Sequence, residues 1–279
     1  MRISGPRIEP GAPTPSLNEK GSSGITRRRF LGGALLGAGA LGVLGEGLAG
    51  RVAAAEDLEL AETGKIGDQQ WAMVIDLRRC DGCGECTTAC QKMHHLPETQ
   101  EWIKVHELED ATGGTYFMPI PCQMCENAPC VRVCPVGATF YQEDGAVVID
   151  QNVCIGCRMC MAACPYGVRT FNWEDPPNIP ERFRSSTPEF TVPQKKGTVG
   201  KCDNCVHALR EGRFPACVEF CSMEAIYVGD LVEDTATNGH DTVVLSDFLR
   251  DNDAFRFKEE MGTAPRVYYI AGHGQDLDY

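Results

Sequence analysis

The chain has 279 residues, of which 43% are hydrophobic and 23% charged, so it can bury a core and is not a disordered tail. Its formal net charge of −13 argues against nucleic acid as a partner, because proteins bind phosphates through an excess of Lys and Arg. Sixteen cysteines far exceed ordinary usage, and such an excess has two common causes, a disulfide framework or metal ligation.

The N-terminal segment resembles a twin-arginine export signal. The run Arg27-Arg28-Arg29-Phe30-Leu31 precedes an apolar stretch rich in Gly and Ala, and residues 53–55 form a small-residue cleavage pattern. A surface basic cluster and an uncleaved membrane anchor are the alternatives, but glycines and Glu46 dilute a stretch barely long enough to span a bilayer. We therefore predict a signal peptide over residues 1–55 and a location in the periplasm or on the outer face of the cytoplasmic membrane.

Beyond the leader, short elements of both kinds are expected. Residues 71–77 alternate in polarity and predict a strand. Residues 139–142 and 146–150 flank Asp144-Gly145, which predicts a β-hairpin. Prolines break residues 173–199 into a loop or insertion, and the tail predicts a helix at 242–250 and a strand at 267–270. No stretch of about 18 apolar residues follows residue 56, so we expect no membrane span in the mature chain.

The cysteines fall into four groups of four, with none left over. Groups one and three have the spacing C-x2-C-x2-C-x3-C, in which three thiolates hold one [4Fe–4S] cube and the fourth reaches the next cluster. Groups two and four are longer versions of the same pattern. Proline follows the last cysteine of groups two and three, and the residues after each last cysteine predict a short helix leading into a strand. The groups are Cys80, Cys83, Cys86 and Cys90; Cys122, Cys125, Cys130 and Cys134; Cys154, Cys157, Cys160 and Cys164; and Cys202, Cys205, Cys217 and Cys221.

Other uses of cysteine fit the spacing less well. Zinc sites take four ligands from two pairs, whereas these groups repeat a triplet with an outlying fourth cysteine. Disulfides are plausible in an exported chain, but C-x2-C pairs make poor structural bridges and a chain of this size does not need eight. A c-type haem requires C-x-x-C-H, and no such pair here is followed by His. The sequence therefore predicts iron–sulfur clusters.

The sequence around the cysteines resembles that of a known family. Residues 72–80, 127–130, 144–150, 163–166 and 201–217 are similar to the iron–sulfur subunits of complex iron–sulfur molybdoenzymes, which serve dimethyl sulfoxide, polysulfide, tetrathionate and nitrite reductases. The resemblance covers roughly residues 70–230 and is greatest to the tetrathionate reductase type. It implies an α+β fold of tandem bacterial-ferredoxin-like 4Fe–4S dicluster modules with loop insertions. The expected segments are 56–120 with the first motif, 121–172 as the central dicluster core, 173–200 as a Pro-rich insertion, and 201–279 with the fourth motif and tail.

The resemblance also implies how the cysteines are shared among four [4Fe–4S] clusters, since the family pairs group one with group four and group two with group three. In groups two and three the last cysteine is followed by proline, whereas in groups one and four it is followed by Gln91 and Ser222. Groups one and four therefore depart from the ferredoxin pattern. We name the four implied ligand sets quartets A to D. Quartet A is Cys80, Cys83, Cys86 and Cys221; quartet B is Cys90, Cys202, Cys205 and Cys217; quartet C is Cys122, Cys125, Cys130 and Cys164; quartet D is Cys134, Cys154, Cys157 and Cys160.

The implied function is electron transfer without catalysis, in anaerobic respiration. The partners would be a molybdopterin-type catalytic subunit and an integral membrane subunit that reacts with quinone. The sequence contains no acid–base pair, nucleophile or phosphate-binding loop that would predict a catalytic pocket. A free ferredoxin-type carrier, or a relay of a hydrogenase or a sulfite-metabolism membrane complex, remains the alternative.

Other residues near the cysteines also have expected roles. Basic residues beside the cysteines could tune the clusters, although each could equally be ordinary surface charge. Two histidines after group one are expected on an exposed loop, and one near group four is expected to pack locally. Methionines are expected around the clusters and tryptophans in the core or at interfaces. These residues are Arg78, Arg79, Arg132, Arg158 and Lys201; His94, His95 and His207; Met124, Met159 and Met161; and Trp71, Trp102 and Trp173.

Overall fold

The computed structural model describes residues 69–110, 112–176, 179 and 186–273. The predicted signal peptide lies outside these residues. Within them, no helix is long and apolar enough to cross a membrane.

A six-stranded sheet joins the two ends of the described chain. Its central strand is β1 (Trp71–Asp76), which pairs antiparallel with β8 (Ile226–Asp230) and parallel with β12 (Val267–Ile270). The strand order is β10-β9-β8-β1-β12-β11, with β9 at Thr235–Thr237, β10 at Thr242–Val244 and β11 at Ala254–Arg256. The strands predicted at 71–77 and 267–270 are therefore present.

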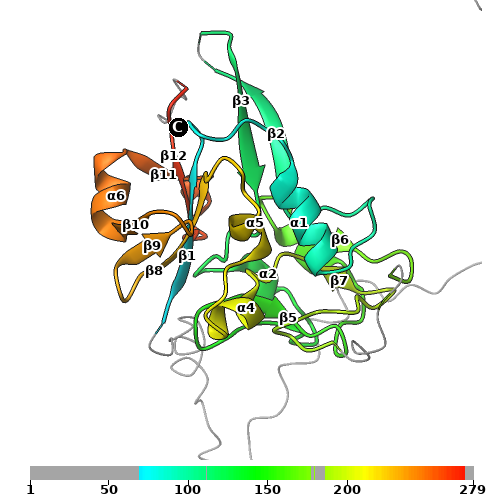
Figure 1. Ribbon diagram of the computed structural model, residues 1–279. Coiled ribbons are helices and arrows are strands. Elements are labelled where there is room, and N and C mark those ends of the chain that lie inside the picture. Colours follow the sequence, from blue (N-terminus) through cyan, green and yellow to red (C-terminus); the bar gives the residue numbers. More distant parts are fainter. Residues whose placement is uncertain (1–68, 111, 177–178, 180–185, 274–279) are drawn as a thin grey trace, which may run out of the picture. The chain divides into compact units, whose positions relative to one another are not determined.

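Both faces of this sheet are covered, which explains why β1 is almost entirely buried. On one face, Val74 packs with Leu245 of helix α6 (Leu245–Asp251). On the other, Ile75 belongs to the main core with Trp102 and with residues of helices α1 (Glu85–Met93) and α5 (Ala216–Glu219). Figure 1 shows α6 on the outer side of the sheet and α1 and α5 on the inner side. One face of the sheet thus packs against the segments that carry the cysteines.

Within the described residues, three two-stranded antiparallel sheets complete the β structure. Strands β2 (Lys104–Glu109) and β3 (Thr115–Ile120) form the longest, and β6 (Thr170–Phe171) pairs with β7 (Val199–Gly200). Strands β4 (Thr139–Tyr141) and β5 (Val147–Ile149) form the predicted hairpin. Its turn needs glycine, because Gly145 has φ 74° and a Cβ there would collide with the Arg266 guanidinium. Residues 173–199 were expected to be a loop, and their described part has neither helix nor strand up to Thr198. The prediction was wrong at its end, because Val199 begins β7.

The short helices lie one step earlier than predicted. Helices α2 (Pro129–Arg132), α3 (Met159–Ala163) and α5 each contain the third cysteine of a group and end before the fourth. The residues after the fourth cysteine form a turn and then the predicted strand. The reason is clearest at Cys164, which is extended (φ −79°, ψ 113°) because a residue before proline disfavours the helical region.

The tail corrects another prediction. Residues 242–244 belong to strand β10, and the helix begins only at Leu245. Thr242, Val243 and Val244 are β-branched and pair with β9, so the pleated strand fits them better than a helical turn. The remaining elements are helix α4 (Val206–Arg210), which follows Cys205, and a short 3-10 helix, η1 (Glu259–Met261).

Candidate iron–sulfur cluster sites

All sixteen cysteines lie in the described part of the chain, and each is a free thiol. The loops that carry groups one and three contain glycines in the left-handed region, with φ 80° at Gly82, 74° at Gly84 and 68° at Gly156. A side chain would strain these turns, and a Cβ on Gly82 would collide with the ring of Phe117. The glycines therefore allow the tight wrapping that three ligands from a single loop require.

Quartet A combines the first loop with a distant cysteine. Burial raises the pKa of the Cys80 thiol, and its like-charged neighbours Cys221 and Cys83 raise it further. Burial also raises the pKa of Cys86 to about 12, with Cys80 and Cys221 again as neighbours. The structure thus brings Cys221, which follows α5 in the sequence, close to the loop of group one.

Quartet B is the most deeply buried. Burial raises the pKa of the Cys90 thiol well above its ordinary value, and the nearby Cys202, Cys205 and Cys217 thiols add to the rise. Cys90 projects from α1, while two of its neighbours come from the loop before α4 and the third from α5. The contact between α1 and α5 is what brings these distant segments together.

Quartets C and D come from the central segment. Cys125 has a pKa raised to about 12, chiefly by burial, with Cys122, Cys130 and Cys164 as its thiol neighbours. Cys160 has Cys154 and Cys134 as thiol neighbours. Cys157, the remaining member of quartet D, lies in the same loop as Cys154 and is exposed to solvent.

Electrostatic interactions between members of different quartets follow an order. Cys217 of quartet B has Cys86 and Cys221 of quartet A among its neighbours. Cys202 of quartet B has Cys122 of quartet C as its strongest like-charged neighbour. The positive charge of Arg169 opposes the rise in the pKa of both Cys130 of quartet C and Cys160 of quartet D. These interactions link the four sets in the order A, B, C, D.

The donor chemistry fits iron–sulfur clusters. Buried thiols that crowd without forming disulfides resist ionisation, which a bound metal overcomes by coordinating the thiolate directly. The site of Cys134 is already suited to a thiolate. Burial would raise its pKa, but backbone hydrogen bonds from residues 136–139 lower it below the ordinary value. A set of four thiolate sulfurs is the ligand set that a [4Fe–4S] cube takes.

Two buried cations lie among these thiols. Lys201 is 1% exposed, and its Nζ donates to the Cys202 carbonyl oxygen at 2.7 Å. Its positive charge lowers the pKa of Cys202, against the larger effect of burial. Arg169, 4% exposed, was not among the basic residues expected from the sequence. The sequence indicates its burial only in that Arg169 is the one charged residue in the run from Gly167 to Phe171.

The other basic residues expected near the clusters lie closer to solvent. Arg132 and Arg158 are exposed, and the Arg158 guanidinium lies over the rings of Phe171 and Trp173, 5.3 and 5.4 Å from their centroids. Arg78 pairs with Asp76 at 2.8 Å. These contacts assign Arg158 and Arg78 to local surface packing.

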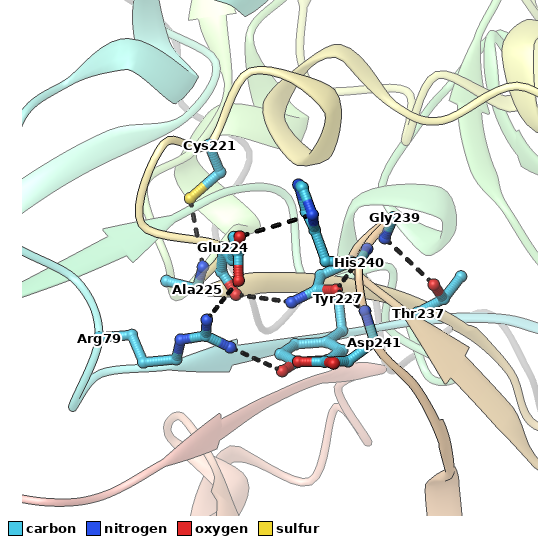
Figure 2. A network of polar contacts seen from close by, with 10 residues as sticks. Arg79, Cys221, Glu224, Ala225, Tyr227, Thr237, Gly239, His240 and Asp241 are labelled. Carbon is cyan, nitrogen blue, oxygen red and sulfur yellow. Dashed lines mark hydrogen bonds and ion pairs between the residues drawn. The ribbon is translucent and has the colours of Figure 1, made fainter.

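Arg79 belongs to a polar network that holds the end of quartet A against the sheet (Figure 2). Its guanidinium donates to Glu224 at 2.6 Å and to the Tyr227 hydroxyl at 2.9 Å. The backbone N–H of Ala225 donates to the Cys221 sulfur at 3.3 Å, just before β8 begins. The network therefore fixes Cys221 relative to the central sheet.

The aromatic and sulfur residues divide between core and surface. Met124 and Trp102 are buried as expected, while Met159 and Trp173 are exposed by 53% and 65%. Met159 therefore does not pack in the interior around the clusters. His94 contradicts the expectation of an exposed loop, since it is buried directly after α1.

His94 is buried because it completes an aromatic group. His207 packs against Phe190, with ring centroids 4.2 Å apart, and meets His94 edge-on at 5.9 Å. The local packing expected of His207 is confirmed. The sequence gives no periodic signal for His94, because its burial depends on segments far along the chain.

Comparison with known proteins decides the family. Family profiles described as 4Fe-4S dicluster domains match residues 72–138, 114–177 and 146–222. The chain is 37% identical to a selenate reductase subunit of Mesobacillus selenatarsenatis, over 91% of this chain and 100% of the relative. It is 33% identical to the arsenate respiratory reductase iron–sulfur subunit of a Shewanella species, over 74% of this chain and 98% of the relative. It is 35% identical to a tetrathionate reductase subunit of Salmonella typhimurium, over 72% of each chain.

The chain belongs to this family of reductase iron–sulfur subunits. The fold predicted from the sequence, tandem ferredoxin-like 4Fe–4S dicluster modules with helices and strands, is confirmed. All three relatives are named as reductase subunits, and the arsenate relative as the iron–sulfur subunit, so this member is an electron-transfer subunit rather than a catalytic one. The matched profiles establish [4Fe–4S] clusters as its cofactor class.

Proposed function

We propose that this iron–sulfur subunit relays electrons through four [4Fe–4S] clusters between a quinone-reactive membrane subunit and a molybdopterin-type catalytic subunit. Quartets A to D would hold one cluster each, with all sixteen cysteines as ligands. Each cluster supplies a centre that accepts and releases one electron. The order of the quartets supports this proposal most directly, since members of neighbouring sets interact electrostatically from one end of the series to the other.

The burial of the ligands supports a relay with two ends. Quartets B and C contain no exposed cysteine, whereas A and D contain one each, Cys83 and Cys157. The protein thus excludes water from the middle of the series, where burial also sets the potential. Electrons would enter and leave through the end quartets.

Exposed apolar side chains lie near both ends. Near Cys157 the exposed side chains include Ile155, at 63%, and Met159. Near Cys83 and Cys221, Phe220 is 57% exposed and lines a groove of about 970 Å³. Apolar surface of this kind is typical of protein contacts. It supports two docking partners better than a carrier that diffuses freely.

The proposed location is the outer face of the cytoplasmic membrane, in the periplasm. Its support is the run from Arg27 to Leu31 followed by the small-residue pattern at 53–55, which together are typical of twin-arginine signals. Such signals carry proteins that have already folded around their cofactors, which suits a chain loaded with clusters in the cytoplasm.

Anaerobic isolation from the native host with an affinity tag on this chain tests the function. We expect the membrane fraction to yield a complex containing two partners, with iron and sulfide each near sixteen per chain. Paramagnetic resonance of the reduced complex should integrate to about four spins per chain. A colourless protein with zinc or oxidised thiols would refute the cluster proposal. A monomer that exchanges electrons with several proteins would instead favour the free carrier.

A further inference from the structure

One buried histidine lies directly against a cysteine of quartet B. The Nε2 atom of His94 is 3.4 Å from the Cys205 sulfur and 3.6 Å from Asp203 Oδ1. All three side chains are buried, at 1%, 6% and 3% exposure. The same Asp203 oxygen accepts a hydrogen bond from the Cys205 backbone N–H at 2.9 Å. One imidazole nitrogen therefore faces two acceptors at once.

The surroundings hold the ring in this orientation. His94 packs against Trp102 and Phe190, with ring centroids 4.8 and 5.8 Å apart, and against His207. Its other nitrogen, Nδ1, is buried and has no hydrogen-bond partner among the described residues. Since only Nε2 faces acceptors, the tautomer with the proton on Nε2 is the one that satisfies the ring.

We propose that His94 is a positioning residue that donates an Nε2–H hydrogen bond to the Cys205 sulfur and thereby raises the reduction potential of the cluster on quartet B. The inference rests on the proposed function, because it presumes a cluster at that quartet. An N–H···S hydrogen bond withdraws electron density from the ligand sulfur and stabilises the more negative, reduced cluster.

Asp203 opposes the effect of His94 on the reduction potential. Its carboxylate lies beside both Nε2 of His94 and the Cys205 ligand, so it competes with the sulfur for the same proton. Its negative charge also disfavours the reduced cluster. His94 and Asp203 therefore act on the same cluster in opposite directions, which gives the proposal a signed test.

The test is an anaerobic redox titration of the complete complex, followed by paramagnetic resonance. In His94→Phe, which keeps a ring but lacks the N–H, one of the four cluster signals should move to lower potential while the other three stay. In His94→Gln, which keeps an N–H donor, the shift should be smaller. In Asp203→Asn the same signal should move to higher potential.

His207→Phe is the matched control, because it alters the same aromatic group and leaves the His94 N–H in place. We expect all four potentials to stay at their wild-type values in this variant. If His94→Phe loses iron, the opposite shifts of His94→Gln and Asp203→Asn, measured in fully loaded protein, decide the question. Unchanged potentials in loaded variants, or an upward shift without His94, would overturn the inference alone. A wild-type complex without clusters would instead overturn the proposed function.

Discussion

Arg169 carries a buried positive charge between two sets of cysteines. Its Nη1 donates to the Thr139 hydroxyl at 3.2 Å, and its Nη2 is buried with no partner of good hydrogen-bond geometry in the part of the chain that the structure describes. Burial alone would lower the pKa of this guanidinium, but the thiolates of Cys130 and Cys160 raise it above the ordinary value. A buried cation is tolerated only where nearby negative charge compensates it. Sulfur-bound clusters at quartets C and D would supply that charge.

Arg169→Met should therefore lower the reduction potentials of two clusters together. We expect shifts on the order of 100 mV, because unit charges a few ångströms apart at an effective dielectric constant near 20 interact by about 2–4 kcal/mol. The loss of a positive charge disfavours the reduced state of both clusters. Redox titration monitored by paramagnetic resonance measures both shifts in one sample.

Arg158→Met provides the comparison at an exposed arginine next to quartet D. Water and salt screen this charge, so its removal should move the potentials much less. Equal shifts in the two variants would show that burial does not set the influence of Arg169.

Strand β1 supports the cysteine loops. Ile75 is fully buried in the core that includes Trp102, Tyr269 and residues of α1 and α5. Ile75→Ala removes apolar contacts and leaves a cavity, so the free energy of unfolding should fall by about 2–5 kcal/mol. Anaerobic denaturation followed by circular dichroism measures this change. Val244→Ala, at an exposed edge position of β10, should change stability by less than about 0.5 kcal/mol; a comparable loss there would refute the role given to the core.

Local sequence patterns predicted elements better than their partners. The alternation of residues 71–77 and the Asp144-Gly145 turn are local signals, and both gave correct predictions. No local signal shows that β1 pairs with β8 and β12, because these strands come from the far end of the chain. The prediction of an exposed His94 was wrong for the same reason. Its burial depends on Trp102, Phe190 and His207, which only the folded chain brings together.

The cluster sites also divide into features that local sequence predicts and features that only the folded chain shows. The cysteine groups were readable from spacing, because three ligands of a cube come from a single loop. Which distant cysteine joins each loop is not readable from spacing and came only as an implication of the family resemblance. Arg169 and Lys201 are charged residues that a hydrophobicity pattern places at the surface, and only the fold shows them buried.

The series of quartets also makes a prediction about stability, because the cysteines differ in how much of the chain they tie together. Quartet B joins Cys90 of α1 to the loop before α4 and to Cys217 of α5, and it lies between quartets A and C. Cys157 of quartet D sits in an exposed loop at the end of the series. A cluster lost at B would leave crowded, buried thiols inside the core, whereas one lost at D would leave a solvated loop.

Cys157→Ala should therefore lower the iron content by about a quarter and leave the other three clusters in place. Cys205→Ala should lose more than one cluster and most of the soluble protein, because metal binding at the buried site contributes to folding itself. Iron and sulfide per chain, together with the yield of soluble complex, measure both outcomes. If Cys205→Ala were as soluble as Cys157→Ala and kept three clusters, quartet B would be no more important to the fold than quartet D. The burial of its thiols would then follow from the packing of α1 against α5, and not from a need to enclose a metal centre.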